Sequence, residues 1–561
     1  MPDYEKEYQE FSWDQAKEEL TFFEDGTFNA AYNAVDRHAN SEKKDRLALI
    51  YESDTGEKET YTFSQFKELT DKFANVLTSN GVQKGDRVFI FLPPIPERYI
   101  AFLGILKTGA IAGTMFSAFQ EAALIDRLSD SGAKIVVTNS ELFPRIEKIW
   151  KDLPELKKII LTEKDNLPEG ENLISYHQEM DKASPNFEIA HMKPDDFAYM
   201  LYTSGTTGKP KGVVHAHADL LQAILTTKYV LDVKDSDIYW CTADIGWVTG
   251  VVYGVLGVWG LGGTSVVYGG RFSPESWYKI IQDHKVTVWY TAPTAIRMLM
   301  GSPVSPKQYD LSSLRHLCSV GEPLNPEGVM WGKETLGLPF HDTWWQTETG
   351  SICITNYPSM DIKPGSMGKP FPGVVAGIVD DSGKELPAGQ EGHLALKPET
   401  VYSLMKQIWK NEEKYQSYFQ NGWYISGDQA YKDEDGYFWF VGRADDVIKT
   451  SGERVGPFEV ESTLIEHPKV LEAGVIGKPD ELRGEIIKAF VVLKQGVEPS
   501  DALKEEIAAF VKGKLAGHAY PREVEFIDKL PKTRSGKIMR RVLKAKELGL
   551  PTGDTSTLEE F

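Results

Sequence analysis

At 561 residues the chain is longer than a single hydrophobic core usually organises, so we expect at least two compact units. Hydrophobic residues make up 41% and charged residues 26%, which excludes a disordered chain of low hydrophobicity. The net charge of −20 opposes general binding to nucleic acid or to an anionic membrane, and we expect neither as a partner. A polyanionic ligand would need a local basic site.

The cysteines and the N-terminus bear on the compartment. Cys241, Cys318 and Cys353 are odd in number and lack metal-ligand spacing, so we expect reduced thiols. The stretch from Met1 to Trp13 is acidic and polar, without the pattern of a signal peptide. Both features predict a cytoplasmic protein.

Through residues 1–444, apolar β-type segments alternate with helical patterns. We expect strands at 46–52, 86–92, 133–138 and 158–162, and helices at 62–80 and 97–108. Thr62 and Gln65 are spaced as a capping box for the first helix. This alternation is typical of α/β folds, so we predict a large N-terminal α/β domain with parallel-type sheets covered by helices.

Residues 245–267 carry no charge and contain the spacing Gly246, Gly250, Gly254, which raises the alternative of a membrane-spanning helix. The segment is dense in glycine and β-branched residues and lacks basic residues on one flank. Buried elements broken by turns are therefore favoured.

The pattern changes near residues 442–452, GRADDVIKTSG, which are polar and bounded by glycines. Beyond them we expect a strand at 488–493, a helix at 501–515 and a strand at 523–527. We therefore predict a second domain of α+β type over residues 445–561, with the junction at Asp445.

Residues 202–212, YTSGTTGKPKG, form the strongest local signal. Glycines let backbone N–H groups approach phosphate closely, hydroxyl groups add donors, and Lys209 and Lys211 add positive charge. Lys209 is followed by Pro210, so the loop is not of the Walker A type. It predicts a phosphate-binding loop, with a flexible surface turn as the alternative.

This loop resembles the signature of the adenylate-forming enzymes, which include acyl-CoA synthetases, peptide-synthetase adenylation domains and luciferases. Further segments match in order and spacing: VGEP at 320–323, DTWWQTETG at 342–350, WYISGD at 423–428, GRADDVIKTSGER at 442–454 and LPKTRSGKIMRR at 530–541. The resemblance covers nearly the whole chain and is strongest to short bacterial acetyl-CoA synthetases of the AMP-forming type.

The resemblance implies a nucleotide site for ATP and AMP. Asp428 would accept hydrogen bonds from the ribose hydroxyls, and Arg443 would also reach the ribose. The other residues implied for ATP or AMP are Thr203, Ser204, Gly205, Thr206, Thr207, Gly208, Lys209, Gly321, Glu322, Pro323, Asp342, Thr343, Trp344, Trp345, Gln346, Thr347 and Arg454.

Lys537 lies in the most basic stretch of this acidic chain, because residues 529–546 hold eight Lys or Arg and no acid. A nucleic-acid patch and a solvated surface are the alternatives. The resemblance implies that Lys537 stabilises the carboxylate and the α-phosphate during adenylation, and that Asp445 is the hinge of a mobile C-terminal domain. It also makes a lysine acetyltransferase and deacetylase acting on Lys537 candidate partners.

The acid pocket implied by the resemblance consists of Trp247, Val248, Thr249, Val320 and Trp345. The bulky Trp345 would close this pocket after one or two carbons, so acetate is the expected acid and propionate or another short acid is the alternative. With the family set aside, an ordinary core residue is the alternative interpretation of Trp345.

The implied reaction forms acetyl-AMP and pyrophosphate from acetate and ATP, then transfers the acetyl group to coenzyme A. For coenzyme A the implied residues are Thr249, Ser451, Gly452 and Lys512. For Mg²⁺ they are Glu348 and, at a second position, Ile465, His467 and Val470. We expect His215 and His217 to be structural rather than basic catalysts.

The sequence departs from the family's pattern at two coenzyme A positions. Lys512 stands where some relatives have an arginine on coenzyme A, and the arginines that longer relatives place on the 3′-phosphate have no match. A nucleotide-binding regulator that forms no product is the alternative from another class.

Overall fold

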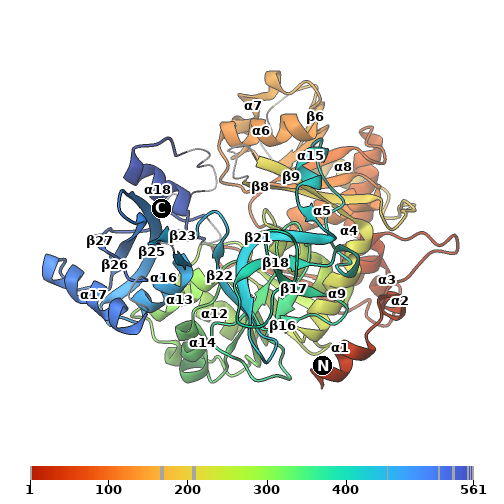
Figure 1. Cartoon of the computed structure of the whole chain (residues 1–561). Coiled ribbons are helices and arrows are strands. Elements are labelled where there is room, and N and C mark those ends of the chain that lie inside the picture. Colours follow the sequence, from red (N-terminus) through yellow and green to blue (C-terminus); the bar gives the residue numbers. More distant parts are fainter. Residues whose placement is uncertain are drawn as a thin grey trace.

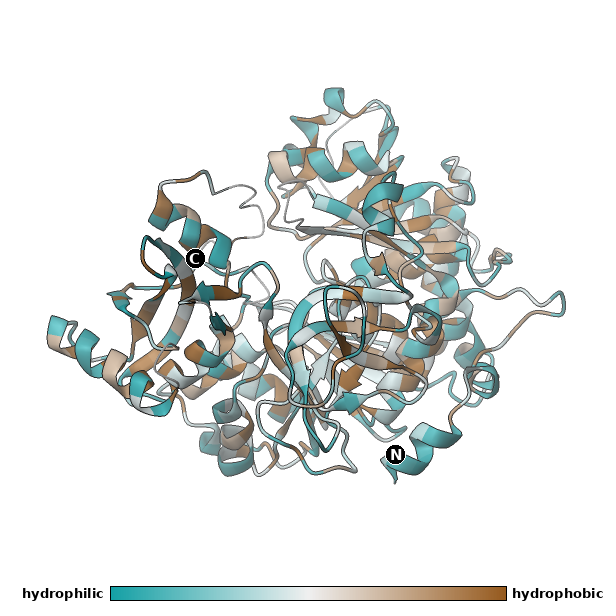
Figure 2. Ribbon diagram, in the orientation of Figure 1, coloured by the Kyte–Doolittle hydropathy of each residue, from teal (hydrophilic) through white to brown (hydrophobic). Residues whose placement is uncertain are grey.

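The computed structural model describes residues 3–163, 168, 170–204, 210–451, 453–515, 519–533, 537–552, 555 and 558. Figure 1 shows the N-terminal elements, red to cyan, gathered on one side and the C-terminal elements, blue, on the other. Apolar residues are concentrated in the strands and on the inner faces of the helices, as the brown segments of Figure 2 show.

One large sheet of the N-terminal region has the strand order β19-β9-β8-β4-β3-β5-β6-β7. Strands β8 to β7 in this order pair in parallel, and β9 and β19 add antiparallel pairs at one edge. Their bounds are β3 (Arg87–Phe91), β4 (Ile111–Thr114), β5 (Ile135–Thr138), β6 (Lys158–Leu161), β7 (Leu173–Ser175), β8 (Phe197–Ser204), β9 (Pro210–Ala216) and β19 (Gln407–Ile408).

A second large sheet has the order β16-β15-β14-β13-β12-β10-β11-β1-β2, parallel from β14 to β1. Its strands are β1 (Leu47–Glu52), β2 (Lys58–Thr62), β10 (Ile238–Cys241), β11 (Thr264–Tyr268), β12 (Val288–Thr291), β13 (His316–Ser319), β14 (Phe340–Trp344), β15 (Ile354–Thr355) and β16 (Lys369–Pro370). The parallel cores of both sheets confirm the predicted α/β class.

The sequence did not predict a third sheet, which is antiparallel. It contains β17 (Ala376–Val379), β18 (Gly392–Leu396), β20 (Phe419–Gln420), β21 (Trp423–Lys432) and β22 (Phe438–Arg443). Asp428 of β21 pairs in register with Arg443 of β22, so the sheet brings these two residues together.

Helices cover the sheets of the N-terminal region. The Thr62 cap of α4 forms the predicted capping box with Gln65. The helices are α1 (Tyr4–Glu10), α2 (Trp13–Ala16), α3 (Arg37–Ala39), α4 (Phe63–Ser79), α5 (Pro96–Lys107), α6 (Glu121–Ser131), α7 (Phe143–Glu147), α8 (Tyr176–Lys182), α9 (Leu220–Tyr229), α10 (Val248–Val251), α11 (Gly257–Gly260), α12 (Pro274–His284), α13 (Pro293–Met300), α14 (Pro326–Trp331) and α15 (Glu412–Gln416).

The uncharged segment 245–267 folds as α10, a π-helix over Val252–Leu256, α11 and the start of β11. Across the described part of the chain, no helix is both long and apolar enough to cross a membrane. The prediction of buried elements broken by turns is confirmed for this segment.

The C-terminal region has its own hydrophobic core, made of residues from Ile448 onward. Its sheet follows the order β24-β23-β26-β25, with β27 paired to β26. The sequence prediction found β26, α17 and β27 but missed β25, which forms a long antiparallel hairpin with β26. The elements are β23 (Ile448–Thr450), β24 (Glu453–Val455), α16 (Pro457–Ile465), β25 (Val470–Asp480), β26 (Gly484–Leu493), α17 (Asp501–Lys514), β27 (Glu523–Phe526) and α18 (Arg540–Leu548).

Candidate active site

A cavity of about 1110 Å³ is lined by residues from both regions of the molecule. Most of the residues that the sequence placed in one site line it together. They are Thr203, Trp247, Val248, Thr249, Val320, Gly321, Glu322, Pro323, Asp342, Thr343, Trp344, Trp345, Gln346, Thr347, Glu348, Asp428, Arg443, Asp445, Ile465 and Lys537.

Asp428 lies on β21 with only 4% of its surface exposed. Its carboxylate accepts hydrogen bonds from Trp344 Nε1 (2.9 Å), Gln346 Nε2 (3.2 Å) and Arg443 Nη1 (3.0 Å). Burial raises the pKa of Asp428, and the Arg443 guanidinium opposes that rise. The carboxylate is therefore held rigidly, with its charge partly balanced by one cation at the cavity wall.

Gln346 fixes the loop that follows β14. Its Nε2 also donates to the Ser426 carbonyl (2.9 Å), and its Oε1 accepts from the Tyr424 hydroxyl (2.8 Å). The loop after β14 is thus tied to β21 by side-chain hydrogen bonds, so the two walls of the cavity form one unit.

Asp342 lies on β14, and Glu322 lies in the loop after the neighbouring parallel strand β13. Asp342, on β14, accepts from Ser319 Oγ (2.6 Å), and burial raises the pKa of its carboxyl to about 7. Glu322 accepts from Thr294 Oγ1 (2.6 Å) and pairs with Arg297 Nη2 (2.7 Å). Gly321, between these strands, has a φ of +94°, a conformation that favours glycine.

Glu348 contacts Lys211, at the end of the phosphate-type loop. It pairs with Lys211 Nζ (2.8 Å) and accepts from the Tyr418 hydroxyl (3.1 Å), and Lys211 also donates to that hydroxyl. Burial alone would raise the pKa of Glu348, but the Lys211 ammonium, a backbone hydrogen bond and the charge of Arg443 together outweigh burial and lower the pKa. Glu348 is thus an ionised carboxylate that lines the cavity.

The residues predicted for the acid pocket line the cavity from two separate parts of the chain. Trp345 Nε1 donates to the Tyr290 hydroxyl (3.2 Å), and its ring meets Tyr253 edge-on at 5.1 Å. Trp247 lies at the start of α10, with its ring against Phe116 at 4.6 Å. Trp345 is therefore both a packed core residue and a cavity wall.

The two histidines beside the phosphate-type loop are structural, as expected. His215 contacts Asp219 Oδ2 (2.8 Å) and the Thr347 carbonyl (2.7 Å), and no part of its surface is exposed. His217 Nδ1 accepts from the Ala30 N–H (3.1 Å), and burial lowers the pKa of His217 to about 3. Both rings tie loops together rather than facing the cavity.

Lys537 enters the cavity from the C-terminal region. Its backbone pairs with Thr533, since the Thr533 N–H donates to the Lys537 carbonyl (2.8 Å). By surface area Lys537 is exposed, yet desolvation by the cavity wall and the charge of Arg443 lower its pKa, against the opposing charge of Asp428. A cation therefore faces the Asp428 and Arg443 pair from the opposite side of the cavity.

Several predicted residues are not brought to this cavity. Ser451, Arg454 and Lys512 are exposed on the C-terminal region, and Ser451 has a φ of +54°. His467 and Val470 are buried, and His467 Nε2 pairs with Glu506 at 3.3 Å. Within the described ranges no group of three His, Cys, Asp or Glu is arranged to hold a metal. Gly205, Thr206, Thr207, Gly208, Lys209 and Gly452 lie outside the described residues, as does the side chain of Ser204.

The sequence prediction missed residues that hold the site together. Tyr418, Tyr290 and Arg297 each contact a predicted site residue through a side-chain hydrogen bond. None lies inside a matched motif, and their partners are distant in the chain, so spacing gave no signal for them.

The comparisons with known proteins agree with this geometry. The AMP-binding enzyme family matches residues 35–409, and the AMP-binding enzyme C-terminal domain matches residues 459–537. The chain is 57% identical to acetyl-coenzyme A synthetase of Bacillus subtilis (strain 168), covering 100% of this chain and 98% of the relative. It is 43% identical to acetyl-coenzyme A synthetase of Methanothrix thermoacetophila, covering 96% of this chain and 86% of the relative.

Solved structures show the same relationship. An anthranilate CoA ligase in complex with anthranoyl-AMP matches with a TM-score of 0.86 and 33% identity, covering 95% of this chain and 99% of that one. An acyl-CoA synthetase of Brucella canis matches with a TM-score of 0.75 and 34% identity, covering 98% and 99%. The chain therefore belongs to the AMP-binding enzyme family, in the branch that contains the acetyl-coenzyme A synthetases.

Proposed function

We propose that this enzyme ligates acetate to coenzyme A with ATP, through an acetyl-adenylate, and releases AMP and pyrophosphate. The observation that carries the proposal is one cavity in which Lys537, the Asp428 and Arg443 pair and the Trp345 wall come together. The relatives named acetyl-coenzyme A synthetase, and the structural relative that holds an acyl-adenylate, support the same reaction.

In the first step, an oxygen of the acetate carboxylate forms a bond to the α-phosphorus of ATP. The bond from that phosphorus to the bridging oxygen breaks, and pyrophosphate leaves. Two negative groups must approach each other, so a positioned cation at their meeting point lowers the barrier. We assign this role to Lys537, whose ammonium faces the cavity.

In the second step, the thiol of coenzyme A attacks the acyl carbonyl, the bond to the phosphate oxygen breaks, and AMP leaves with the thiol proton passed to solvent. No protein nucleophile is needed in either step. This fits the structural roles of His215 and His217.

The nucleotide would lie along the wall that β21, β22 and the loop after β14 form. Three side chains already donate to the Asp428 carboxylate, so its remaining acceptor site, on the oxygen that Arg443 holds in place, suits a ribose hydroxyl. Gly321, Glu322 and Pro323 would contact the base, and the loop from Thr203 would hold the phosphates. Arg454 is exposed away from the cavity in this arrangement.

Glu348 fits a magnesium ion that arrives with the nucleotide. Mg²⁺ keeps several waters and takes one or two carboxylates together with phosphate oxygens, and Glu348 offers one ionised carboxylate at the cavity wall. When bound, Mg²⁺ would neutralise phosphate charge. The backbone around Ile465, His467 and Val470 remains a second candidate position, although the His467 ring is already paired with Glu506.

We further propose that the C-terminal domain, residues 445–561, rotates about Asp445 relative to residues 1–444 between the two steps. Asp445 lies 3.8 Å from Arg443 Nε, at the point where the chain passes between the two regions. Rotation would replace Lys537 by Ser451, Gly452 and Lys512 as the groups facing coenzyme A, with Thr249 on the fixed side. A hinge concentrates such changes in a few backbone angles.

Two further parts of the proposal concern the cell. We place the enzyme in the cytoplasm, where ATP and coenzyme A are available. Acylation of Lys537 by a lysine acetyltransferase would remove the cation needed for adenylation, and a deacetylase would restore it.

The test is acid-dependent AMP formation with ATP, Mg²⁺ and coenzyme A, comparing acetate, propionate and butyrate. We expect wild type to prefer acetate and Trp345→Gly to shift toward longer acids, because the variant opens the end of the pocket. Trp277→Ala is the matched control, since Trp277 is 8% exposed against 9% for Trp345 and packs on Trp240 outside the cavity. Release of no pyrophosphate with any short acid would favour the regulator alternative.

A further inference from the structure

We propose that Arg98 is a positioning residue that sets the width of the acid pocket through its ion pair with Asp244. The inference rests on the proposed function, since it concerns which acid the enzyme selects. Arg98 lies in the first turn of α5, far from the motifs that define the site, and none of its surface is exposed.

The guanidinium of Arg98 binds the Asp244 carboxylate through both of its terminal nitrogens. Its Nη1 and Nη2 donate to Asp244 Oδ2 (2.6 Å) and Oδ1 (2.7 Å), and Nη2 also donates to the Met115 carbonyl (3.1 Å). Among the described residues, Nε has no acceptor. A buried guanidinium in this fork geometry fixes both the position and the plane of the carboxylate.

Asp244 in turn shapes the turn that leads into the pocket. Its Oδ1 accepts the Gly246 N–H (2.6 Å), and its carbonyl accepts the Trp247 N–H (3.0 Å). The first turn of α10 also packs directly on it, because a Cβ at Gly250 would lie 2.3 Å from the Asp244 carbonyl oxygen. The position of Asp244 therefore determines where Trp247, Val248 and Thr249 stand.

The opposite wall is anchored independently of Arg98. Trp345 is held by Tyr290, whose hydroxyl also contacts Thr343 Oγ1 at 2.8 Å. Trp345 and the turn at 247–249 line the same cavity, and we take the width of the acid pocket to be their separation. Because Arg98 ties that turn to α5, a change at Arg98 moves one wall and leaves the other in place.

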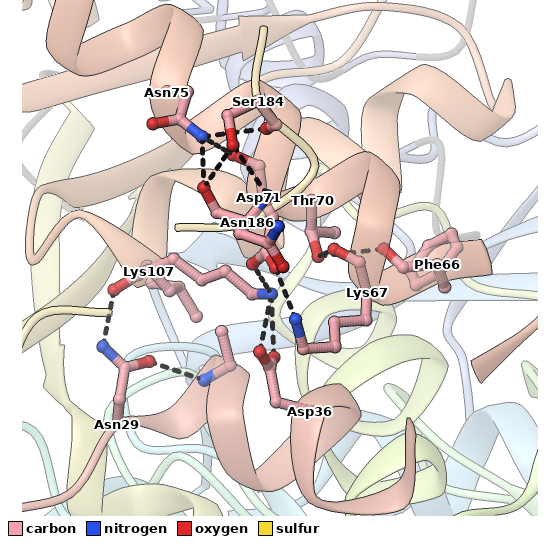
Figure 3. A network of polar contacts seen from close by, with 12 residues as sticks. Asn29, Asp36, Phe66, Lys67, Thr70, Asp71, Asn75, Lys107, Ser184 and Asn186 are labelled. Atoms are coloured by element: carbon pink, nitrogen blue, oxygen red, sulfur yellow. Dashed lines mark hydrogen bonds and ion pairs between the residues drawn. The ribbon is translucent and has the colours of Figure 1, made fainter. Parts of the chain in front are cut away.

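The control comes from a second buried ion network that begins on the same helix. Lys107, at the end of α5, donates to Asp71 (2.6 Å) and Asp36 (3.0 Å), and Lys67 donates to Asp71 (2.6 Å), as Figure 3 shows. No residue of this network lines the cavity. Lys67→Met removes one buried ion pair of this network while Lys107 still neutralises Asp71.

The experiment measures kcat/KM for acetate, propionate and butyrate, and KM for ATP, in wild type, Arg98→Lys, Asp244→Asn and Lys67→Met. Arg98→Lys keeps the charge but loses the fork, so we expect the acetate to propionate ratio to fall roughly tenfold with KM for ATP unchanged. Lys67→Met is expected to keep the wild-type ratio. Asp244→Asn keeps an acceptor for Gly246 and carries the test if Arg98→Lys does not fold.

An unchanged acid ratio in Arg98→Lys and Asp244→Asn would overturn the inference, as would an equal fall in Lys67→Met. These outcomes differ from failure of the proposed function. In that case wild type itself would form no AMP with acetate.

Discussion

Asp428 and Lys537 line the same cavity with opposite charges, but the chain holds them very differently. Asp428 is buried on a central strand and accepts hydrogen bonds from three side chains, two near the end of β14 and one on β22. Lys537 is exposed, and its described hydrogen bonds are those of its backbone to Thr533. One region provides a fixed cradle, whereas the other contributes several cations to the cavity, of which Lys537 lies on the segment between β27 and α18.

This difference matches what each step of the reaction requires. The adenosine part of the nucleotide stays bound through both half-reactions, so its binding groups gain from being preorganised. In the proposed mechanism the cation is needed in only one half-reaction, so its side chain need not be fixed by other side chains of the N-terminal region. Asn325 Nδ2, which donates to Ser462 Oγ at 2.6 Å, is one of the contacts between the two regions.

The largest effect is expected for Lys537→Gln. Loss of the ammonium should lower acetate-dependent exchange of pyrophosphate into ATP by about 10² to 10³-fold, because an electrostatic stabiliser of the transition state is removed. Formation of acetyl-CoA from supplied acetyl-AMP should change only a few-fold. Lys546→Gln, at an exposed position of α18 that does not line the cavity, is the control. Equal losses in both half-reactions would contradict the proposal that Lys537 acts in adenylation alone.

For Asp428→Asn we expect a smaller loss of activity, and one that affects both half-reactions. Hydrogen bonds to a charged group contribute about 1.5 to 3 kcal/mol, so kcat/KM for ATP should fall about 10- to 100-fold. Both half-reactions should weaken together, since both bind the adenosine part, and KM should rise more than kcat falls. Asp433→Asn, which disturbs a surface pair with Lys363 at the next turn, should leave both unchanged. A selective loss of adenylation in Asp428→Asn would show that the cradle is not shared.

The fold could be predicted where the signal is local. The capping box at Thr62 needs only Gln65, three residues away, and the helix forms as predicted. Strand β25 was missed because it forms a strand through its pairing with β26 in a hairpin, and this pairing is not visible in the local sequence. The antiparallel sheet that pairs Asp428 with Arg443 was missed for the same reason. Secondary-structure propensity reflects only the residues nearby in the sequence, whereas strand pairing depends on residues far along the chain.

The same difference between local and long-range signals applies to the candidate site. Motif residues could be assembled because the resemblance preserves their order, and the cavity contains most of them. The groups that hold the motif residues in place could not be predicted. Arg98 and Asp244 are 146 positions apart in the sequence, and Tyr290 and Trp345 are 55 positions apart. Such pairs leave no spacing pattern in a single sequence.

The smallest predicted effect concerns Asp342, which is as deeply fixed as Asp428 but is left without a cation among its hydrogen-bond partners. Burial raises the pKa of Asp342 from 3.8 to about 7, although the bonds from Ser319 and the Leu324 N–H oppose the rise. Between these values the folded state holds a proton that the unfolded state releases, so this contribution to stability is lost as pH rises through about 7. The Tm advantage of wild type over Asp342→Asn should therefore shrink between pH 5 and pH 8, by roughly 2 °C or more. Thermal unfolding of both proteins across that range, at constant ionic strength, checks it. A constant or growing difference would mean that the buried carboxyl is ionised throughout, and that the cradle tolerates an unpaired charge.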